Sequence, residues 1–170
     1  MTISLNPNST SVLILRADGK VLACSRKDDE SAFGLPGGKV DERETDIRLS
    51  AARELREETG IERGWADHHM SRMLMHLYSG LCEGGKSGKP YMNHCYMIIT
   101  DEFDREGRWI KPKQIEGEGR VAWIDPELLF YGPFANYNKR VFNHIGFVSK
   151  VPSIISPPTP EELLERIEVV

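Results

Sequence analysis

The chain has 170 residues, a net charge of −4 at neutral pH and a pI near 5.8. Hydrophobic residues make up 39% of the sequence and charged residues 28%, as in ordinary soluble proteins. This length fits one domain with a well-formed core. The acidic balance argues against a broad basic surface, so no nucleic-acid partner is expected. No apolar run reaches the roughly 18 residues of a membrane helix, so we expect no membrane association.

The cysteines indicate neither a disulfide framework nor a zinc site. Cys24, Cys82 and Cys95 are odd in number, and no C-x-x-C pair is present. The N-terminus lacks the basic and then apolar pattern of a signal peptide. We therefore expect free thiols and a cytoplasmic location.

The first elements expected along the chain are two short strands, at 11–15 and 21–25, joined by a hairpin turn at Asp18-Gly19. The segment SAFGLPGGK follows, and its glycines permit a tight loop with close backbone approach. Apolar spacing then predicts a helix over about 46–59 that ends at Gly60.

The second half of the chain predicts another pair of strands, RMLMHLYSG and YMNHCYMIIT, around a glycine-rich loop at 80–90. A strand at 121–124, a helical turn in DPELLF and a helix over 134–146 follow. An extended linker and a last helix with capping-box residues form the tail. We therefore expect a body over 1–150, built as a mixed sheet with helices on its faces, and a linker with a helical tail over 151–170.

The stretch GLCEGGKS, residues 80–87, matches the P-loop pattern G-x-x-x-x-G-K-[ST]. A P-loop needs a helix directly after its Lys-Ser, because the helix N-terminus binds the phosphates. Here Gly88 and Pro90 follow, and then a run that favours a strand. We interpret the match as a flexible hairpin loop, with a P-loop phosphotransferase as the less favoured alternative.

Residues 35–61 carry the clearest chemical signal. At 100° per residue, small and apolar side chains share one side of the predicted helix and three glutamates share another. The core-facing residues are Ala51, Ala52, Leu55 and Thr59, and the glutamates are Glu54, Glu57 and Glu58. Carboxylates in the last helical turn oppose the helix dipole by ~0.3–1 kcal/mol each.

Two interpretations of this acidic cluster remain open. It is either a solvated helix face with ion pairs to Arg53 and Arg56, or a functional site in which carboxylates stand at the helix end that disfavours them. The preceding glycine loop favours the second interpretation, because it can bring backbone carbonyls near the carboxylates. Such an oxygen-rich cluster suits Mg²⁺ or Mn²⁺.

From Gly38 to Ile61 the sequence resembles the Nudix box, G-x5-E-x7-R-E-U-x-E-E-x-G-U, where U is apolar. Gly38 and Glu44 fit the first part, and residues 53–61 fit the second. One departure is that eight residues, rather than seven, separate Glu44 from Arg53. This puts the role of Glu44 in doubt and leaves the carboxylate cluster intact. The resemblance implies an α/β fold, the α/β/α sandwich of Nudix hydrolases with helices on both faces of a mixed sheet.

The resemblance also implies an enzyme of the EC 3.6.1 type, which hydrolyses a nucleoside diphosphate linked to another group and uses Mg²⁺ or Mn²⁺. The implied metal ligands are Glu54, Glu57, Glu58 and the Gly37 carbonyl. Arg53 corresponds to the arginine that orients the glutamates. The general base is either a box glutamate, here Glu57 or Glu58, or a glutamate on a later loop. Glu116 and Glu118 lie on such a loop, and we favour Glu118.

Further residues are candidates for holding the substrate. Lys39 and Arg26 are candidate phosphate contacts beside Gly38. The aromatic candidates for base stacking are Trp109, Tyr78, Phe134 and Tyr137. A small-molecule nucleotide is the expected partner, and a homodimer is left open.

Among substrates, we rank a nucleoside triphosphate, cleaved to monophosphate and pyrophosphate, first. The alternatives are a dinucleoside polyphosphate, a nucleotide sugar, or a Nudix domain that binds nucleotide without cleaving it. Tyr78 fits a pattern of the dinucleoside polyphosphate hydrolases, whereas His76 takes the position of the proline that marks the ADP-ribose group. The intact glutamates argue against a domain that only binds.

Overall fold

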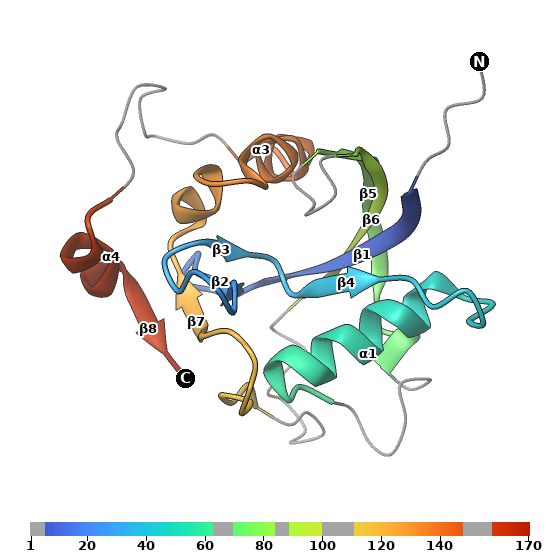
Figure 1. Cartoon of the computed structure of the whole chain (residues 1–170), viewed down its shortest axis with the longest axis horizontal. Helices are drawn as coiled ribbons and strands as arrows, with labels where there is room; N and C mark the ends of the chain where they lie inside the picture. Colours follow the sequence, from blue (N-terminus) through green and yellow to red (C-terminus); the bar gives the residue numbers. More distant parts are fainter. Residues whose placement is uncertain (1–5, 63–69, 84–88, 100–110, 148–157) are drawn as a thin grey trace.

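The computed structural model of the protein describes residues 6–62, 70–83, 89–99, 111–147 and 158–170. One mixed sheet lies between α1 on one face and α3 on the other (Figure 1). The strands are β1 (Asn6–Leu15), β2 (Val21–Ser25), β3 (Phe33–Gly34), β4 (Gly37–Lys39), β5 (Met75–Cys82), β6 (Tyr91–Ile99), β7 (Val121–Ile124) and β8 (Ile167–Val169). The helices are α1 (Ile47–Thr59), the 3-10 helix η2 (Pro126–Phe130), α3 (Ala135–His144) and α4 (Pro160–Arg166). This arrangement confirms the predicted α/β fold.

The central strand β1 shares one of its edges between two partners. It pairs in parallel with β6 along its other edge, in the strand order β5-β6-β1-β2-β7-β8. On the shared edge it pairs with β2 at Leu15 and with β4 over Ser9–Ser11, antiparallel in both cases. The strands β2 and β4 therefore occupy different stretches of this edge, and the paired glycines Gly37 and Gly38 belong to β4.

Each face of the sheet has its own core, because side chains alternate along β1. Val12 and Ile14 pack with the buried residues of α1, whereas Leu13 packs with Val141 and Phe142 of α3. Ser9 and Ser11 have the parity of Leu13 and belong to the α3 face. The α1 residues predicted to face the core are all fully buried, namely Ala51, Ala52, Leu55 and Thr59.

The ends of α1 lie where the sequence predicts them. Asp46 is the N-cap, and its side chain accepts a hydrogen bond from the Arg48 amide. Gly60 ends the helix in the left-handed region, with φ at 71°, and its amide donates to the Arg56 carbonyl. A residue with a Cβ is strained in that conformation, which explains why a glycine stops this helix.

The P-loop look-alike belongs to a β-hairpin. Its first residues form the end of β5, which pairs antiparallel with β6 from Met75↔Met97 to Cys82↔Tyr91. Residues 84–88, with Lys86 and Ser87, lie outside the described part of the chain. Strand β6 begins at Tyr91, where a P-loop would require a helix, so the hairpin interpretation is confirmed.

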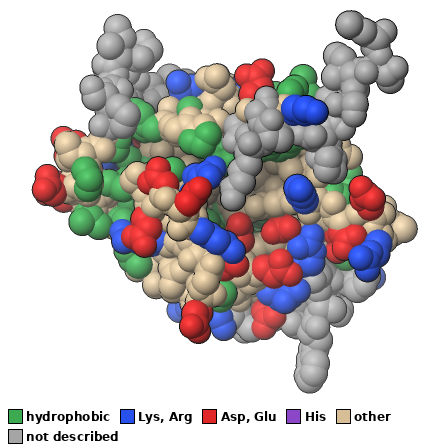
Figure 2. All heavy atoms as spheres, viewed as in Figure 1, with side chains coloured by type: hydrophobic (Ala, Val, Ile, Leu, Met, Phe, Trp, Pro, Cys, Tyr) green, Lys and Arg blue, Asp and Glu red, His purple; other side chains and the backbone are tan. Residues whose placement is uncertain are grey.

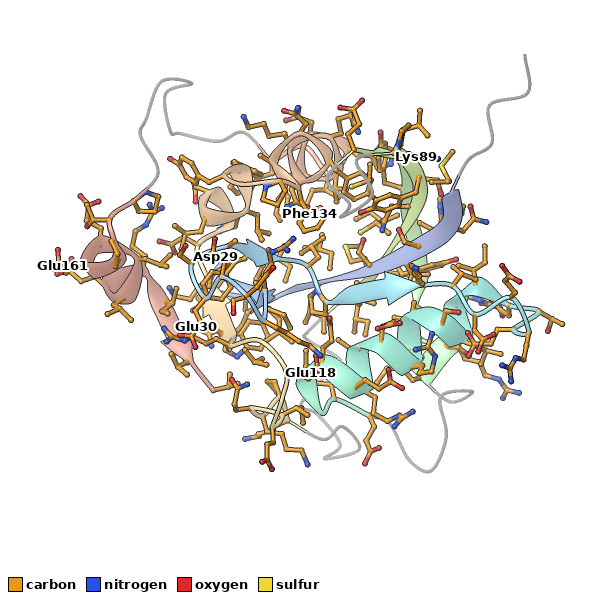
Figure 3. The ribbon with its side chains drawn as sticks, viewed as in Figure 1. Asp29, Glu30, Lys89, Glu118, Phe134 and Glu161 are labelled. Carbon is orange, nitrogen blue, oxygen red and sulfur yellow. The ribbon has the colours of Figure 1, made fainter. Side chains whose placement is uncertain are left out.

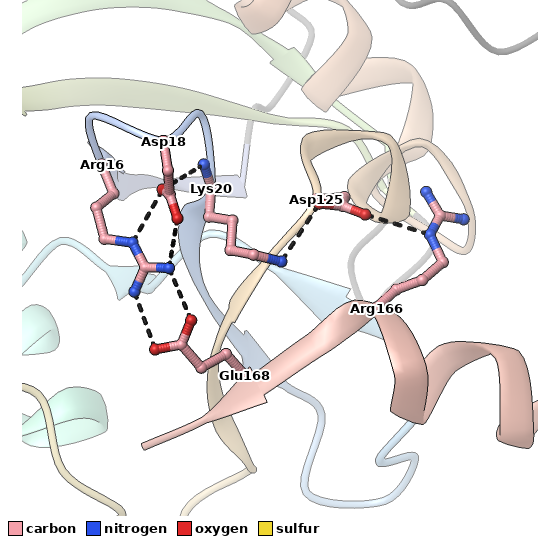
Figure 4. A network of polar contacts seen from close by, with 6 residues as sticks. All are labelled: Arg16, Asp18, Lys20, Asp125, Arg166 and Glu168. Atoms are coloured by element: carbon pink, nitrogen blue, oxygen red, sulfur yellow. Dashed lines mark hydrogen bonds and ion pairs between the residues drawn. The ribbon is translucent and has the colours of Figure 1, made fainter.

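The end of the chain returns to the sheet. The predicted capping box of Thr159 and Glu162 begins α4, and most of the predicted linker lies outside the described residues. Strand β8, which was not predicted from the sequence, pairs antiparallel with β7. Arg16 bridges Asp18 and Glu168 at 2.7 Å each and thereby ties β8 to the β1–β2 turn (Figure 4). None of the helices in the described ranges is long and apolar enough to cross a membrane.

Candidate active site

Two glycines of β4 let the segment between β3 and α1, called here the glycine loop, lie directly against its neighbours. A Cβ on Gly37 would overlap the backbone of β1 and would lie 2.7 Å from the Ser11 Cα. A Cβ on Gly38 would lie 2.5 Å from the carboxyl carbon of Glu54. The sequence therefore places glycine where β1 and a box glutamate leave no room for a side chain, which confirms the predicted close approach.

Two of the three helix glutamates are largely withdrawn from water. The Gly37 amide donates a 2.8 Å hydrogen bond to Glu58 Oε2. Burial, together with the smaller effect of the neighbouring charges of Glu54 and Glu118, nevertheless raises the pKa of Glu58 to about 8, although that hydrogen bond opposes the shift. Burial also raises the pKa of Glu54, although the nearby Arg53 opposes the shift. These carboxylates are thus held close together in a site that disfavours their charge.

Arg53 connects the carboxylates to the glycine loop. Its Nη1 lies 2.9 Å from Glu54 Oε1 and 3.2 Å from Glu57 Oε2, and its Nη2 donates to the Lys39 carbonyl at 3.2 Å. Its Nε lies 3.7 Å from Glu44 Oε1 and is buried without a hydrogen-bond partner. The guanidinium therefore fixes the directions of two box glutamates relative to the loop.

Glu44 and Glu57 have different surroundings from Glu54 and Glu58. Glu44 accepts a hydrogen bond from the Ser50 hydroxyl at the start of α1. The Glu57 side chain is 47% exposed, whereas Glu58 is half-buried and hydrogen-bonded to the Gly37 amide. Figure 2 shows acidic and basic side chains gathered together over α1 on this face of the molecule.

A cavity of about 360 Å³ opens beside the glycine loop. Charged residues line one part of it, namely Arg26, Lys27, Asp28, Glu58 and Glu118. Neutral residues line another part, among them Ser9, Ser11, Leu35, Tyr91, Asn93, Phe134 and Tyr137. Glu118 lies beside the C-terminal end of α1 and Phe134 at the start of α3 (Figure 3). The cavity thus runs between the glutamate cluster and the α3 side of the sheet.

The structure brings most of the predicted site residues to this cavity. Gly37, Gly38, Glu58, Arg26 and Glu118 line it. The Arg26 guanidinium forms two 2.8 Å hydrogen bonds with Asp28 in the same lining.

Other predicted residues lie behind or beside the cavity. Glu54 lies directly behind Gly38. The Lys39 side chain is exposed and is not part of the lining, so a phosphate contact there requires a ligand that extends out of the cavity. Phe134 and Tyr137 line the cavity, Tyr78 instead packs against Tyr137 and His144, and Trp109 lies outside the described residues.

Sequence reasoning missed two features of the site. Lys27 contributes a cation next to Arg26, and its Nζ lies 2.9 Å from Glu118 Oε1. Asn93 and the serines of β1 form a buried polar floor on the α3 side of the cavity. Polar residues at positions of the two central strands that point towards a core would have indicated this floor.

The donor set fits a hard divalent cation. Glu54, Glu57 and Glu58 supply only carboxylate oxygens, which Mg²⁺ and Mn²⁺ prefer. Within the described ranges, no three His, Cys, Asp or Glu side chains already surround one ion position. Cation binding therefore requires these carboxylates to turn from the partners they now have, Arg53 for Glu57 and the Gly37 amide for Glu58.

We expect the metal-free protein to lose stability as the pH rises from about 4.5 towards about 8. The pKa of Glu58 is raised from 4.5 to about 8, so the folded state binds more protons than the unfolded state in this window. The free energy of unfolding therefore falls with increasing pH. Thermal unfolding in a chelator at pH 5 to 9 measures this slope. The Glu58→Gln variant should show a flatter slope, and an unchanged slope would contradict the assignment.

The comparisons with known proteins agree with this geometry. The NUDIX domain family matches residues 5–145. The chain therefore belongs to the Nudix family. This confirms the resemblance carried by the box and the expected class of enzyme, a pyrophosphohydrolase. No curated protein matches the sequence.

Solved structures share the fold at low sequence identity. A MutT NUDIX hydrolase from Burkholderia pseudomallei is 21% identical, with 82% of this chain and 97% of that chain covered and a TM-score of 0.59. The NUDIX domain of Shewanella oneidensis NrtR, in complex with ADP ribose, is 16% identical, with coverages of 85% and 88% and a TM-score of 0.58. A bifunctional NMN adenylyltransferase/ADP ribose pyrophosphatase from Francisella tularensis, in complex with AMP and a Mn ion, is 18% identical, with coverages of 84% and 42% and a TM-score of 0.57.

Proposed function

We propose that the protein is a metal-dependent pyrophosphohydrolase that cleaves a nucleoside triphosphate to the monophosphate and pyrophosphate. One observation carries this proposal: two half-buried carboxylates with raised pKa values, Glu54 and Glu58, lie against the paired glycines at the cavity. Burial and mutual repulsion disfavour their charges, and a divalent cation offsets both effects. The cavity volume is within the range of small-molecule sites.

Each box residue has a proposed role. Glu54, Glu57 and Glu58, with the Gly37 carbonyl, would hold Mg²⁺, or Mn²⁺ in its place. A divalent cation bound there neutralises charge on a pyrophosphate and lowers the pKa of a coordinated water. Arg53 holds Glu54 and Glu57 at 2.9 Å and 3.2 Å, and the Gly37 amide holds Glu58 at 2.8 Å.

Glu118 is the proposed general base. It lines the cavity close enough to Glu54 and Glu58 to raise the pKa of each. In this role its carboxylate accepts a proton from the attacking water. Lys27 and Arg26 are the cations of the lining and would hold the phosphates while the bond between them breaks.

A panel of nucleotides with Mg²⁺, with the products identified, tests this proposal. We expect hydrolysis of a nucleoside triphosphate to release the monophosphate and pyrophosphate. Cleavage only of ADP ribose or of a dinucleoside polyphosphate would favour the alternative substrates. The structure of the NrtR domain in complex with ADP ribose supports ADP ribose as one of these alternatives. Tight binding of nucleotides without any turnover would contradict the hydrolase and favour a domain that only binds.

A further inference from the structure

The α3 side of the cavity has a floor of four buried polar side chains. Ser9 and Ser11 come from β1, Asn93 from β6 and Tyr137 from α3, and all four line the cavity. Their exposed fractions are only 4–8%. Polar side chains buried so deeply need hydrogen-bond partners.

The carbonyl oxygen of Asn93 is fully used inside the protein. Asn93 Oδ1 accepts hydrogen bonds from Ser11 Oγ at 2.8 Å and from Tyr137 Oη at 2.5 Å. An amide oxygen has two lone pairs, and these two hydroxyls occupy both. Asn93 therefore has no acceptor capacity left for a ligand.

Two donor hydrogens remain at the same place. Asn93 Nδ2 donates to Ser9 Oγ at 2.8 Å, and an amide nitrogen carries a second hydrogen. Ser9 Oγ accepts that bond, and its own hydrogen has no acceptor among the described residues. Both donors belong to buried side chains on the cavity wall, where a donor without an acceptor is unfavourable. The floor is therefore complementary to a group that presents adjacent acceptors.

We propose that this floor reads the base of the bound nucleotide and selects a 6-oxopurine over a 6-aminopurine. The inference rests on the proposed function, which places a nucleotide in this cavity. A 6-oxopurine presents two adjacent acceptors, O6 and N7, whereas the 6-amino group of adenine is a donor. An asparagine ordinarily reads adenine with its oxygen and nitrogen together, but here Ser11 and Tyr137 occupy the oxygen.

The neighbouring walls suit a flat base. Leu35, Tyr91 and Phe134 line the same cavity, and the Phe134 ring lies against β3, 3.6 Å from the position of a Cβ on Gly34. Aromatic and apolar walls bind the faces of a base, while the polar floor reads its edge. The charged part of the lining, with Arg26, Lys27 and Glu58, remains for the phosphates and the cation.

Calorimetric binding of the α,β-methylene analogues of inosine and adenosine triphosphate, with Mg²⁺, tests the inference on the full chain. The two bases differ only at position 6 and its neighbouring ring nitrogen, so the ratio of their Kd values isolates the reading of this edge. We expect the inosine analogue to bind at least about 10-fold more tightly. Equal binding, tighter binding of the adenosine analogue, or no binding of either would overturn the inference.

Variants of the floor separate base reading from a merely structural role. Ser9→Ala removes one donor and should reduce the preference to about 3-fold or less, mainly by weakening the inosine analogue. Tyr137→Phe frees a lone pair of Asn93 Oδ1 and should shift the ratio towards adenine. The matched control is Ser25→Ala, which changes a serine in the charged part of the same lining and should leave the ratio unchanged. A ratio that Ser9→Ala and Tyr137→Phe leave unchanged would overturn the inference.

The binding measurement and the hydrolysis assay fail independently of each other. The analogues resist cleavage between the first two phosphates, so their Kd ratio does not depend on turnover. A strong inosine preference without hydrolysis of the natural triphosphate would contradict the proposed enzyme and support base reading. Hydrolysis of both triphosphates with equal kcat/KM, together with equal Kd values, would support the proposed enzyme and contradict base reading.

Discussion

Replacing Glu58 with glutamine is expected to lower kcat by about 10²- to 10³-fold, or roughly 3–4 kcal/mol in the barrier, while the protein stays folded. Glutamine has the shape of glutamate and can accept the hydrogen bond from the Gly37 amide, but it lacks the charge that a cation needs. Because burial raises the pKa of Glu58, the neutral side chain also suits this site better at pH 8 without metal. Steady-state kinetics and thermal unfolding measure the two effects.

Two further variants control this experiment. Glu161→Gln changes an exposed glutamate on α4, away from the cavity (Figure 3), and should leave kcat within about 2-fold. Glu57→Gln should lower kcat by a similar factor, but with little effect on stability because that side chain is half exposed. Normal turnover by folded Glu58→Gln and Glu57→Gln proteins would show that these carboxylates do not hold the cation.

Alanine at the two loop glycines should separate folding from activity. In Gly37→Ala the new Cβ meets the backbone of β1, which cannot yield, so we expect a loss of about 1–3 kcal/mol or more in stability. In Gly38→Ala it meets the end of the Glu54 side chain, which can turn away. Stability should then fall less, whereas kcat should fall about 10²-fold because Glu54 is displaced. Chemical unfolding and steady-state assays compare the two variants.

Gly34→Ala is the matched control for both glycines. Its new Cβ would lie 3.6 Å from Phe134 Cδ2, an ordinary van der Waals distance, so the variant should fold with near-normal stability. Full activity in Gly38→Ala, or a Gly37→Ala protein as stable as Gly34→Ala, would refute the packing described for this loop.

The spacing of residues along α1 predicted its orientation, because a helix places residues on its faces by simple periodicity. The buried and acidic sides both lie where that periodicity places them. The difference between Glu57 and Glu58 could not be predicted. Both belong to the acidic side, and only the approach of Gly37 across the helix end buries one and leaves the other half exposed.

Long-range pairing explains what the sequence did not reveal. β8 has only three residues; it pairs with β7, and its Glu168 forms an ion pair with Arg16, and both partners are distant in the chain. The polar floor has the same origin. Ser9 and Asn93 are hydrogen-bonded although 84 positions separate them, and a single sequence does not show that pairing.

The central claim is that half-buried glutamates at the paired glycines, of which Glu58 has a pKa of about 8, bind a divalent cation. Calorimetric titration of Mg²⁺ or Mn²⁺ in buffers of different ionisation enthalpy counts the protons released on binding, and it tests this claim most directly. With the pKa of Glu58 near 8, that carboxyl is mostly protonated at pH 7. We expect release of close to one proton per cation at pH 7, which declines towards zero at pH 9. We also expect lower affinity and little proton release in Glu58→Gln. The claim would be contradicted if Glu54→Gln and Glu58→Gln bound the cation as tightly as the wild-type protein and if the wild-type protein released no proton.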